Sequence, residues 1–574
     1  MRRLFALVLL VLAVMTVRAQ FTINNLSVVL DSLTGNFLCS IPQENYDGDW
    51  TAKIKLVGGE WDKIIIDGLE ITIKADYTFS ELTGGKIYSF KAVTGTDTLS
   101  YGINFTYYPI LLLEGLEGEF DVNYKSSLVT MIMPGELPMY SLPSKAKWRG
   151  NTTVRYEREK RNYHIKFFDD DGNAMNYRFF PEMREDDSWL LDAGQVDNAR
   201  IRNRVGMNLW MDLVPPMYYQ DREPNAINGV RSRIVEVFLN GKYHGFYSMS
   251  EAVDRKQLKL KKYDKDTKAI HGQLWKASKP NSYTNMEYVE ADYHKTLPNW
   301  HGYELKYPDI DDVKPTDWTP LYRAIDFVVN STDEEFKAQV ADRFDIPVLQ
   351  RYYILYEILL AWDNASKNIY WMIYDKEEQE KVTLAAWDFD ATVGQDYINK
   401  KVIDWEKLSP ERNLALNNRL FQRLWSMNVN NFQTNIKRDY YRLRKTLLKD
   451  ENIIARYIDE INDLQHAGAA QRETERWSGV IDLCYRDLDF DAQKELIIDW
   501  WHRRLAHLDA TMFKVTPVAG DVNRDFVADI EDLNASVNVI LGLTPYDSDA
   551  DLNGDGMVDV EDINQLINII LKLQ

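Results

Sequence analysis

The spacing of apolar residues changes once along this chain of 574 residues. As far as about residue 260, apolar and polar residues alternate in short segments such as "TAKIKLV" and "KIYSFKAV", a pattern typical of half-buried β-strands. Farther on, apolar residues recur at helical spacing, as in 347–362, 418–449 and 491–513. A strand-rich half followed by a helix-rich half predicts a multi-domain α+β protein.

Composition and spacing divide the chain into four segments. Residues 1–19 have the features of a signal peptide, and the evenly spaced strands of residues 20–110 predict a small β-sandwich module. Residues 111–516 continue with strands and then helices, including an early helix predicted at 197–213. Residues 517–574 are a short acidic tail, which we expect to form a domain of its own.

The signal-like segment "MRRLFALVLLVLAVMTVRAQ" has two arginines, an apolar core and small residues before a cut predicted after Ala19. A membrane-spanning helix would need about 20 apolar residues in a row, and this run is shorter. The sequence therefore predicts export to a periplasm, the cell surface or the medium, with no membrane span left after cleavage.

Charge and cysteine content exclude several classes of protein. Removing the signal peptide takes away three arginines and leaves 65 basic against 88 acidic residues, a net charge of −23. This balance argues against nucleic acid and anionic membranes as partners. Cys39 and Cys484 are far apart in the sequence, so we expect two buried free thiols rather than a disulfide framework.

The acidic tail contains an internal repeat with a period of 30 residues, because the segment from 521 realigns with the segment from 551. Each copy places oxygen-bearing groups at positions 1, 3, 5, 7, 9 and 12 of a loop, the pattern that Ca²⁺ prefers. The predicted ligands, with positions 7 acting through the backbone carbonyl, are Asp521, Asn523, Asp525, Val527, Asp529, Asp532, and Asp551, Asn553, Asp555, Met557, Asp559, Asp562.

The tail resembles a type I dockerin, which has two loop-helix units and Asp rather than Glu at position 12. This resemblance implies docking on a cohesin or scaffold partner, whereas the spacing alone implies calcium. A self-contained stabilising module without a partner is the alternative. Gly556 occupies position 6 of the second loop, but Phe526 stands there in the first, where a bulky residue in a left-handed conformation is costly.

Two short motifs suggest chemistry in the larger domain. "DNASKN" places Asp363 and Asn368 five residues apart, and "WDFD" places Asp388 and Asp390 at the end of a predicted hairpin. Phosphoryl transfer needs a carboxylate near the acceptor hydroxyl, together with amide and carboxylate oxygens that hold Mg²⁺. Protein kinases use the same five-residue spacing in their catalytic loop.

Six motifs, in order, resemble the CotH kinase family over roughly residues 115–515. They are "RGNTT", "NYHIKFF", "DNARIRN", "VEVFLNGKYHGFY", "DNASKN" and "WDFDATVG". The resemblance implies an atypical two-lobed protein-kinase fold, β-rich and then helical, that transfers the γ-phosphate of ATP to serine in a partner protein. Unlike ordinary protein kinases, this chain lacks the glycine-rich G-x-G-x-x-G loop and has WDFD instead of DFG.

The resemblance also implies roles for individual residues. Asp363 would act as catalytic base, while Asn368 and Asp388 would hold Mg²⁺ with Asp390 as a second acidic ligand. Lys166 would pair with the nucleotide phosphates. It further implies Glu251 near the adenine edge and Arg202 in a helix that supports the site.

Three functions stay open from the sequence. The first is an exported protein kinase with a calcium-binding tail. The second is an inactive kinase-like module that binds within a surface or polysaccharide-degrading assembly, since ATP is scarce outside the cytoplasm. The third, a glycoside hydrolase, would need two acids about 5 to 9.5 Å apart in a sugar cleft, and no motif indicates one.

Overall fold

The computed structural model describes residues 18–150, 154, 159–290, 299–309, 312–313, 316–395, 413–479, 488–514 and 518–572. Most of the predicted signal peptide and Cys484 lie outside the described residues. Cys39 is a buried free thiol, as predicted, and burial raises its pKa to about 12. Within the described part of the chain, no helix is both long and apolar enough to cross a membrane.

The N-terminal module is built from one hydrogen-bonded sheet of nine strands in the order β6-β5-β8-β9-β3-β2-β1-β4-β7. Phe21 of β1 stacks on Phe90 of β8 with ring centroids 4.7 Å apart, although three strands separate them in this order. The sheet therefore folds over on itself around an apolar core, as in the predicted sandwich. Its strands are β1 (Arg18–Ile23), β2 (Leu26–Leu30), β3 (Asn36–Ser40), β4 (Trp50–Leu56), β5 (Lys63–Ile66), β6 (Leu69–Ile71), β7 (Lys74–Phe79), β8 (Tyr88–Thr94) and β9 (Asp97–Thr106).

The next seven strands close into a barrel in the order β10-β11-β12-β13-β14-β16-β15. Tyr163, Ile165 and Phe167 of β13 point into its core, so their neighbours in the strand face outward. Asn240 and Gly241 both have positive φ in the turn of the β15-β16 hairpin, for which the sequence Asn-Gly is strongly favoured. The strands are β10 (Ile110–Gly115), β11 (Lys125–Ile132), β12 (Met139–Arg149), β13 (Asn162–Phe167), β14 (Ser188–Asp192), β15 (Ser232–Leu239) and β16 (Lys242–Ser250).

A helical part follows the barrel and contains a five-stranded sheet in the order β18-β19-β17-β20-β21. These strands are β17 (Gln273–Ala277), β18 (Asn299–Trp300), β19 (Tyr303–Tyr307), β20 (Ile369–Asp375) and β21 (Gln379–Ala386). The helices up to the tail are α3 (Arg202–Leu213), α4 (Arg255–Leu258), α5 (Thr319–Asn330), α6 (Asp333–Arg343), α7 (Ile346–Leu359), α8 (Leu414–Asn417), α9 (Arg419–Ser426), α10 (Phe432–Arg444), α11 (Asp450–His466), α12 (Ala469–Trp477) and α13 (Phe490–Ala510).

The helix predicted over 418–449 is two helices. α9 ends at Ser426 and α10 begins at Phe432. Between them Asn428, Asn430 and Asn431 all adopt positive φ, which asparagine tolerates better than most residues and which ends a helix. Apolar spacing continues through this break, so periodicity alone does not reveal it.

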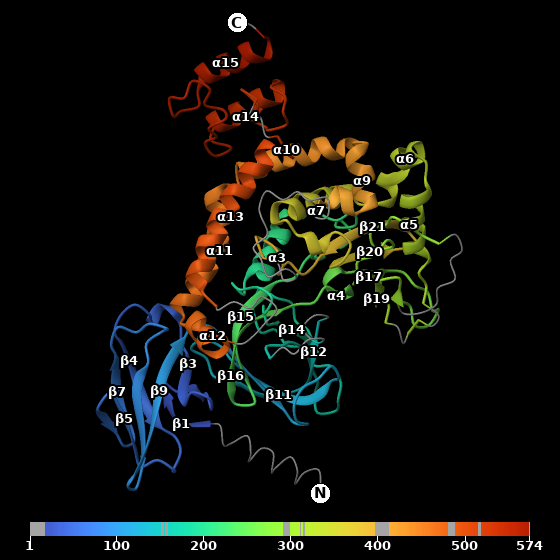
Figure 1. The fold of residues 1–574 in the computed structure, drawn as a ribbon. Helices are drawn as coiled ribbons and strands as arrows, with labels where there is room; N and C mark the ends of the chain where they lie inside the picture. The colour runs from blue at the N-terminus through green and yellow to red at the C-terminus, as the bar shows by residue number, and fades with distance from the viewer. Residues whose placement is uncertain are drawn as a thin grey trace.

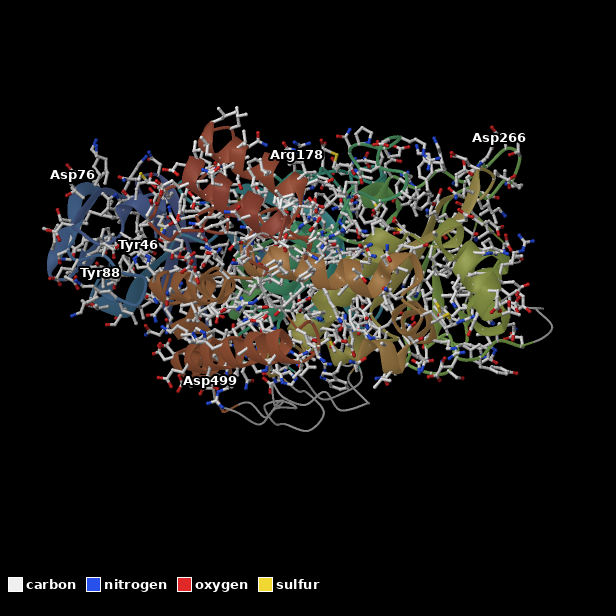
Figure 2. All side chains as sticks on the ribbon, turned by 90° about the horizontal axis from the view of Figure 1, so that it is seen from above. Tyr46, Asp76, Tyr88, Arg178, Asp266 and Asp499 are labelled. Carbon is white, nitrogen blue, oxygen red and sulfur yellow. The ribbon has the colours of Figure 1, made fainter. Side chains whose placement is uncertain are left out.

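α11 and α13 run side by side from the sandwich toward the tail (Figure 1). At the sandwich end, His466 of α11 contacts Asp47 (2.9 Å), and the Tyr107 hydroxyl donates to the Asp463 carbonyl (2.8 Å). Figure 2 shows Tyr46, Asp76 and Tyr88 at this end of the molecule and Asp266 at the opposite end. The α+β arrangement predicted from the sequence is thus observed, with the strand-rich part preceding the helical part.

Candidate functional site

A cavity of about 650 Å³ lies where the outer face of the barrel meets the sheet of the helical part. Strands β12, β13 and β14 line one side, and β17, β19, β20 and the segments after α7 and β21 line the other. Its acidic and amide side chains are Asn162, Asp192, Asn203, Glu304, Asp363, Asn368, Asp388 and Asp390. Its cationic side chains are Lys147, Arg149, Lys276, Lys279, Lys306 and Lys367. Four of the predicted site residues, Asp363, Asn368, Asp388 and Asp390, therefore meet in one cavity.

The segment 363–368 is fixed by its own hydrogen bonds. α7 is buried almost throughout and ends at Leu359, and the positive φ of the next residue, Leu360, stops the helix before the cavity segment. Asp363 accepts a hydrogen bond from Asn368 Nδ2 (3.0 Å) and pairs with Lys367 Nζ (2.6 Å). Asn364 Nδ2 donates to the Trp387 carbonyl (2.7 Å), which joins this segment to the second motif. The two motifs thus form one structural unit.

Asp388 and Asp390 follow β21 and both line the cavity. The backbone N–H of Phe389, between them, donates to Asn203 Oδ1 of α3 (3.0 Å). Asp388 has φ of 68° and Asn368 has φ of 60°. Asp and Asn are the residue types, besides Gly, that most readily adopt this left-handed conformation, so the sequence suits the backbone here.

Asp192, at the end of β14, is a further acidic residue of the cavity that the motifs did not reveal. Burial and the nearby charge of Asp388 raise the pKa of Asp192. Burial raises the pKa of Asp390 more strongly, and Asp388, Asp192 and Asp363 add to it. Crowded carboxylates are stabilised by a cation. The sequence signal that could have identified Asp192 is its position at the end of a strand, which is similar to the position of Asp388 just after β21.

The cations on the cavity wall come mainly from strands. Lys147 and Arg149 lie on β12, and the Arg149 guanidinium sits 5.5 Å from the Trp387 ring centroid. Lys276 of β17 also lines the cavity, and burial lowers its pKa to about 8 even though Asp388 opposes this shift. Sequence reasoning missed Lys276 because "QLWKAS" reads as an ordinary strand.

Lys166, predicted to pair with phosphates, does not line the cavity. It shares the outer face of β13 with Asn162 and His164, which do, but lies at the far end of the strand. His164 is held between the Tyr124 hydroxyl (2.8 Å) and Ser188 Oγ (2.7 Å). Burial, with Arg149 and the two nearby lysines, lowers the His164 pKa to about 3, so this imidazole is neutral at physiological pH.

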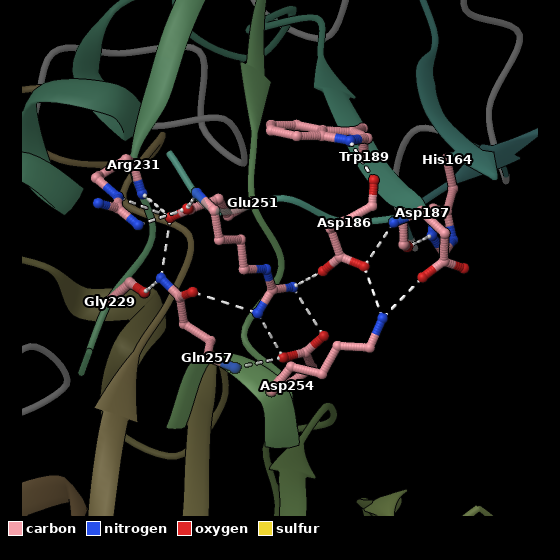
Figure 3. A network of polar contacts seen from close by, with 12 residues as sticks. His164, Asp186, Asp187, Trp189, Gly229, Arg231, Glu251, Asp254 and Gln257 are labelled. Atoms are coloured by element: carbon pink, nitrogen blue, oxygen red, sulfur yellow. Dashed lines mark hydrogen bonds and ion pairs between the residues drawn. The ribbon is translucent and has the colours of Figure 1, made fainter. Parts of the chain in front are cut away.

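Glu251 and Arg202 also lie outside the lining of the cavity. Glu251 is buried in the network of Figure 3, where it accepts from Arg231 Nη2 (2.7 Å), Gln257 Nε2 (2.9 Å) and the backbone N–H of Arg184 (2.8 Å). These hydrogen bonds indicate a structural role for Glu251. Arg202 pairs with Asp197 and donates to the Val393 carbonyl (3.3 Å), so it ties α3 to the segment that follows Asp390.

Among the described residues, no three His, Cys, Asp or Glu side chains form a ready-made cage for a metal ion. Mg²⁺ at nucleotide sites is usually held by one or two carboxylates together with waters and substrate phosphates. Asp388, Asp390 and Asn368, with Asp192 in the same cavity and several cations nearby, fit that mode of binding.

The two loops of the tail share the same internal hydrogen bonds and precede helices α14 (Ile530–Ile540) and α15 (Val560–Ile570). Asp521 Oδ1 accepts from the Asp525 N–H (2.8 Å), and Asp532 Oδ1 accepts from the Asn523 N–H (2.7 Å). The equivalent pairs in the second loop are Asp551 with Asp555 (3.2 Å) and Asp562 with Asn553 (3.1 Å).

The first loop also contains a buried oxygen atom that could coordinate a cation. Asn523 Oδ1, at loop position 3, is buried without a hydrogen-bond partner, and Asp521 and Asp532 are almost fully buried carboxylates. A cation would compensate the unpaired amide oxygen and the charge of the two buried carboxylates. Phe526, at position 6, has φ of 70°, the left-handed conformation expected from the sequence.

The first loop of the tail packs against α10. The Phe526 ring stacks on Tyr441 with centroids 5.2 Å apart, and Arg442 Nε donates to the Asn523 carbonyl (3.0 Å). Lys445 pairs with Asp549 (2.8 Å), which also pairs with Arg524 (3.1 Å). In Figure 1 the tail sits at the end of the molecule remote from the sandwich.

Comparison with protein families identifies residues 146–508 as a match to the CotH kinase protein family. The match covers more than half of the chain and includes the barrel strands β13 to β16, α3, α7 and both motifs of the cavity. The chain therefore belongs to the CotH kinase protein family. A search of curated proteins found no match.

Proposed function

We propose that this protein is an ATP-dependent kinase that transfers the γ-phosphate to a serine of a partner protein. The observation that carries the proposal is the cavity itself, where Asp363, Asn368, Asp388 and Asp390 are brought together with lysine and arginine side chains from both sides of the cavity. Such a combination suits a phosphoryl group, because the carboxylates would hold a metal ion and the cations would hold phosphate oxygens.

Different residues of the cavity would have different roles in the transfer. Asp363 would accept the proton of the serine hydroxyl, and its bonds to Lys367 and Asn368 would hold the carboxylate in position. Lys147, Arg149 and Lys276 supply positive charge for the phosphates. Asn203 supports Asp192 and the backbone between the two WDFD aspartates.

Asn368, Asp388 and Asp390 are the residues that would hold Mg²⁺, with Asp192 beside them. When bound, Mg²⁺ neutralises the charge of the phosphate oxygens and aligns them for in-line transfer.

Titration calorimetry of ATP with the full mature chain, with and without Mg²⁺, tests this proposal. We expect Mg²⁺-dependent binding in the wild type. In Asp363→Asn we expect retained binding and loss of ATP turnover with serine peptides, because the base is removed while the shape is kept. No binding at millimolar ATP would overturn the kinase proposal and leave a binding module in a surface assembly.

We also propose that the protein is exported and that its tail binds two Ca²⁺ ions and docks on a cohesin-type scaffold partner. The repeated loop hydrogen bonds and the orphaned Asn523 Oδ1 support the calcium part of this proposal. The signal-like N-terminus supports export, and the dockerin-like repeat supports the partner.

Chelation tests the calcium proposal in the full chain. Hydrogen exchange of residues 521–572 should rise sharply in EGTA and return to its starting level with Ca²⁺, while exchange in the barrel stays constant. A tail with exchange that ignores the chelator would contradict calcium binding.

A further inference from the structure

Three lysines form a strip on the outer face of β12 and β13, and we call Lys145, Lys147 and Lys166 the basic strip. Lys145 and Lys166 lie directly opposite each other in the strand register, and Lys147 lies opposite His164. The alternation of the strands places all three on the side away from the barrel core.

The positive charge of the strip is not compensated by ion pairs in the described part of the chain. None of the three lysines forms an ion pair with any other residue that the structure describes. Like charges directly opposite each other on a sheet are destabilising. Burial, Lys166 and Lys306 all lower the pKa of Lys147. In a chain with a net charge of −20, this local excess of cations stands out.

Aromatic rings hold the strip on the surface. Lys147 Nζ lies 4.5 Å and Lys166 Nζ 5.6 Å from the Tyr124 ring centroid, and Lys145 Nζ lies 4.9 Å from that of Phe168. These cation–π contacts fix the ammonium groups while leaving them able to bind an anion.

The strip begins at the cavity and leads out of it. Lys147 lines the cavity that also contains Asp363, whereas Lys145 and Lys166 do not line it. A nucleotide held by the cavity wall therefore leaves the outer two lysines to a different anion. A chain that enters the cavity past Lys147 would also pass these two lysines.

We propose that the basic strip binds an acidic polypeptide segment beside the acceptor serine, an inference that rests on the proposed kinase function. Complementary charge would guide the segment to the cavity and fix its direction. The strip selects a short acidic segment rather than a long polynucleotide, since a polyanion extending past three lysines would meet a predominantly acidic protein surface.

Fluorescence anisotropy tests the proposal with a labelled peptide in which three aspartates flank one serine on each side. The wild-type chain should bind it, and the double variant Lys145→Glu, Lys166→Glu should bind about tenfold more weakly. A Lys145→Gln, Lys166→Gln variant should fall between the two and remain folded, because it removes a repulsive pair without adding acids. Binding should weaken as salt rises.

The matched control is Lys53→Glu, Lys55→Glu, which makes the same charge change at two exposed lysines of β4 in the sandwich. It should leave peptide affinity unchanged, and Mg²⁺-ATP calorimetry should be unchanged in all of these variants. If the protein does not bind ATP but still binds the peptide through the strip, the kinase proposal is wrong and the strip proposal stands.

Three results would overturn the proposal. One is equal peptide affinity in the wild type and the strip variants. Another is loss of ATP binding in Lys145→Glu, Lys166→Glu, which would assign the strip to the nucleotide. The last is strip-dependent binding of oligo-dT about tenfold tighter than that of the acidic peptide, which would favour nucleic acid.

Discussion

At the residue scale, Asp388 combines a cavity-facing carboxylate with a left-handed backbone. Asp388→Asn keeps a residue type that tolerates this backbone and removes the charge, so Mg²⁺-dependent ATP affinity should fall about tenfold or more with little change in Tm. Asp388→Ala should lose the same affinity and also about 1 kcal/mol of stability. Calorimetry and thermal unfolding of the two variants separate these effects.

Lys276 gives the site a pH dependence with a definite sign. Burial lowers its pKa to about 8, so the amine loses its charge as pH rises through that value. Mg²⁺-ATP affinity should therefore fall between about pH 7 and 9.5. Lys276→Arg stays charged and should abolish the fall. Calorimetry at several pH values checks this, and an equal fall in the arginine variant would remove Lys276 as its cause.

The sequence predicted site residues that belong to local motifs and missed those that do not. Asp363 and Asn368 are five residues apart, and Asp388 and Asp390 are two apart, so each pair stands within one local motif, and the resemblance to the CotH kinase family joined the two motifs. Asp192, Lys147 and Lys276 come from three separate strands. They meet only because the barrel packs against the second sheet, and this packing leaves no local pattern.

At the element scale, α12 acts as a buried connector between the barrel and the helical part. Glu473 of α12 accepts from Lys160 Nζ (2.7 Å) and Arg200 Nε (2.9 Å), and all three side chains are almost fully buried. Gly245 of β16 lies against Glu473, where an added Cβ would come within 2.1 Å of the carboxylate. The absence of a side chain at 245 is what lets α12 approach β16.

Glu473→Gln should destabilise the protein by about 3 to 5 kcal/mol, because it leaves two buried cations without their carboxylate. Glu475→Gln is the matched control on the same helix, where the exposed pair partner is Gln471 (2.9 Å), and it should change stability by less than about 0.5 kcal/mol. Denaturant unfolding measures both. Equal stability of the two variants would mean that the buried network contributes little.

Elements defined by local pattern were predicted well. The β15-β16 hairpin has Asn240-Gly241 at its turn, and β20 and β21 pair as the predicted hairpin. α3 begins at Arg202 rather than near 197, because Asp197 binds the backbone N–H groups of Ile201 and Arg202 instead. The outer limits of an element thus depend on capping contacts that its apolar spacing does not specify.

At the scale of the whole molecule, the tail packs against α10 and the residue that follows it. Lys445→Glu places a negative charge against Asp549, and Tyr441→Ala removes the stack on Phe526, which is worth about 0.5 to 1.5 kcal/mol. The double variant should release the tail. Small-angle scattering should then show a larger radius of gyration, with wild-type ATP affinity retained. An unchanged scattering curve would mean that other contacts hold the tail.

The barrel uses its inner face for packing and its outer face for the cavity, and this division affects how the gene can vary. Along β13, substitutions at Tyr163, Ile165 and Phe167 should reduce the amount of protein recovered from cells. Changes at Lys147 and Arg149 on β12 should leave yield intact and alter only chemistry. Fitness plotted against position would oscillate with a period of two, so that neighbouring codons are under different kinds of selection.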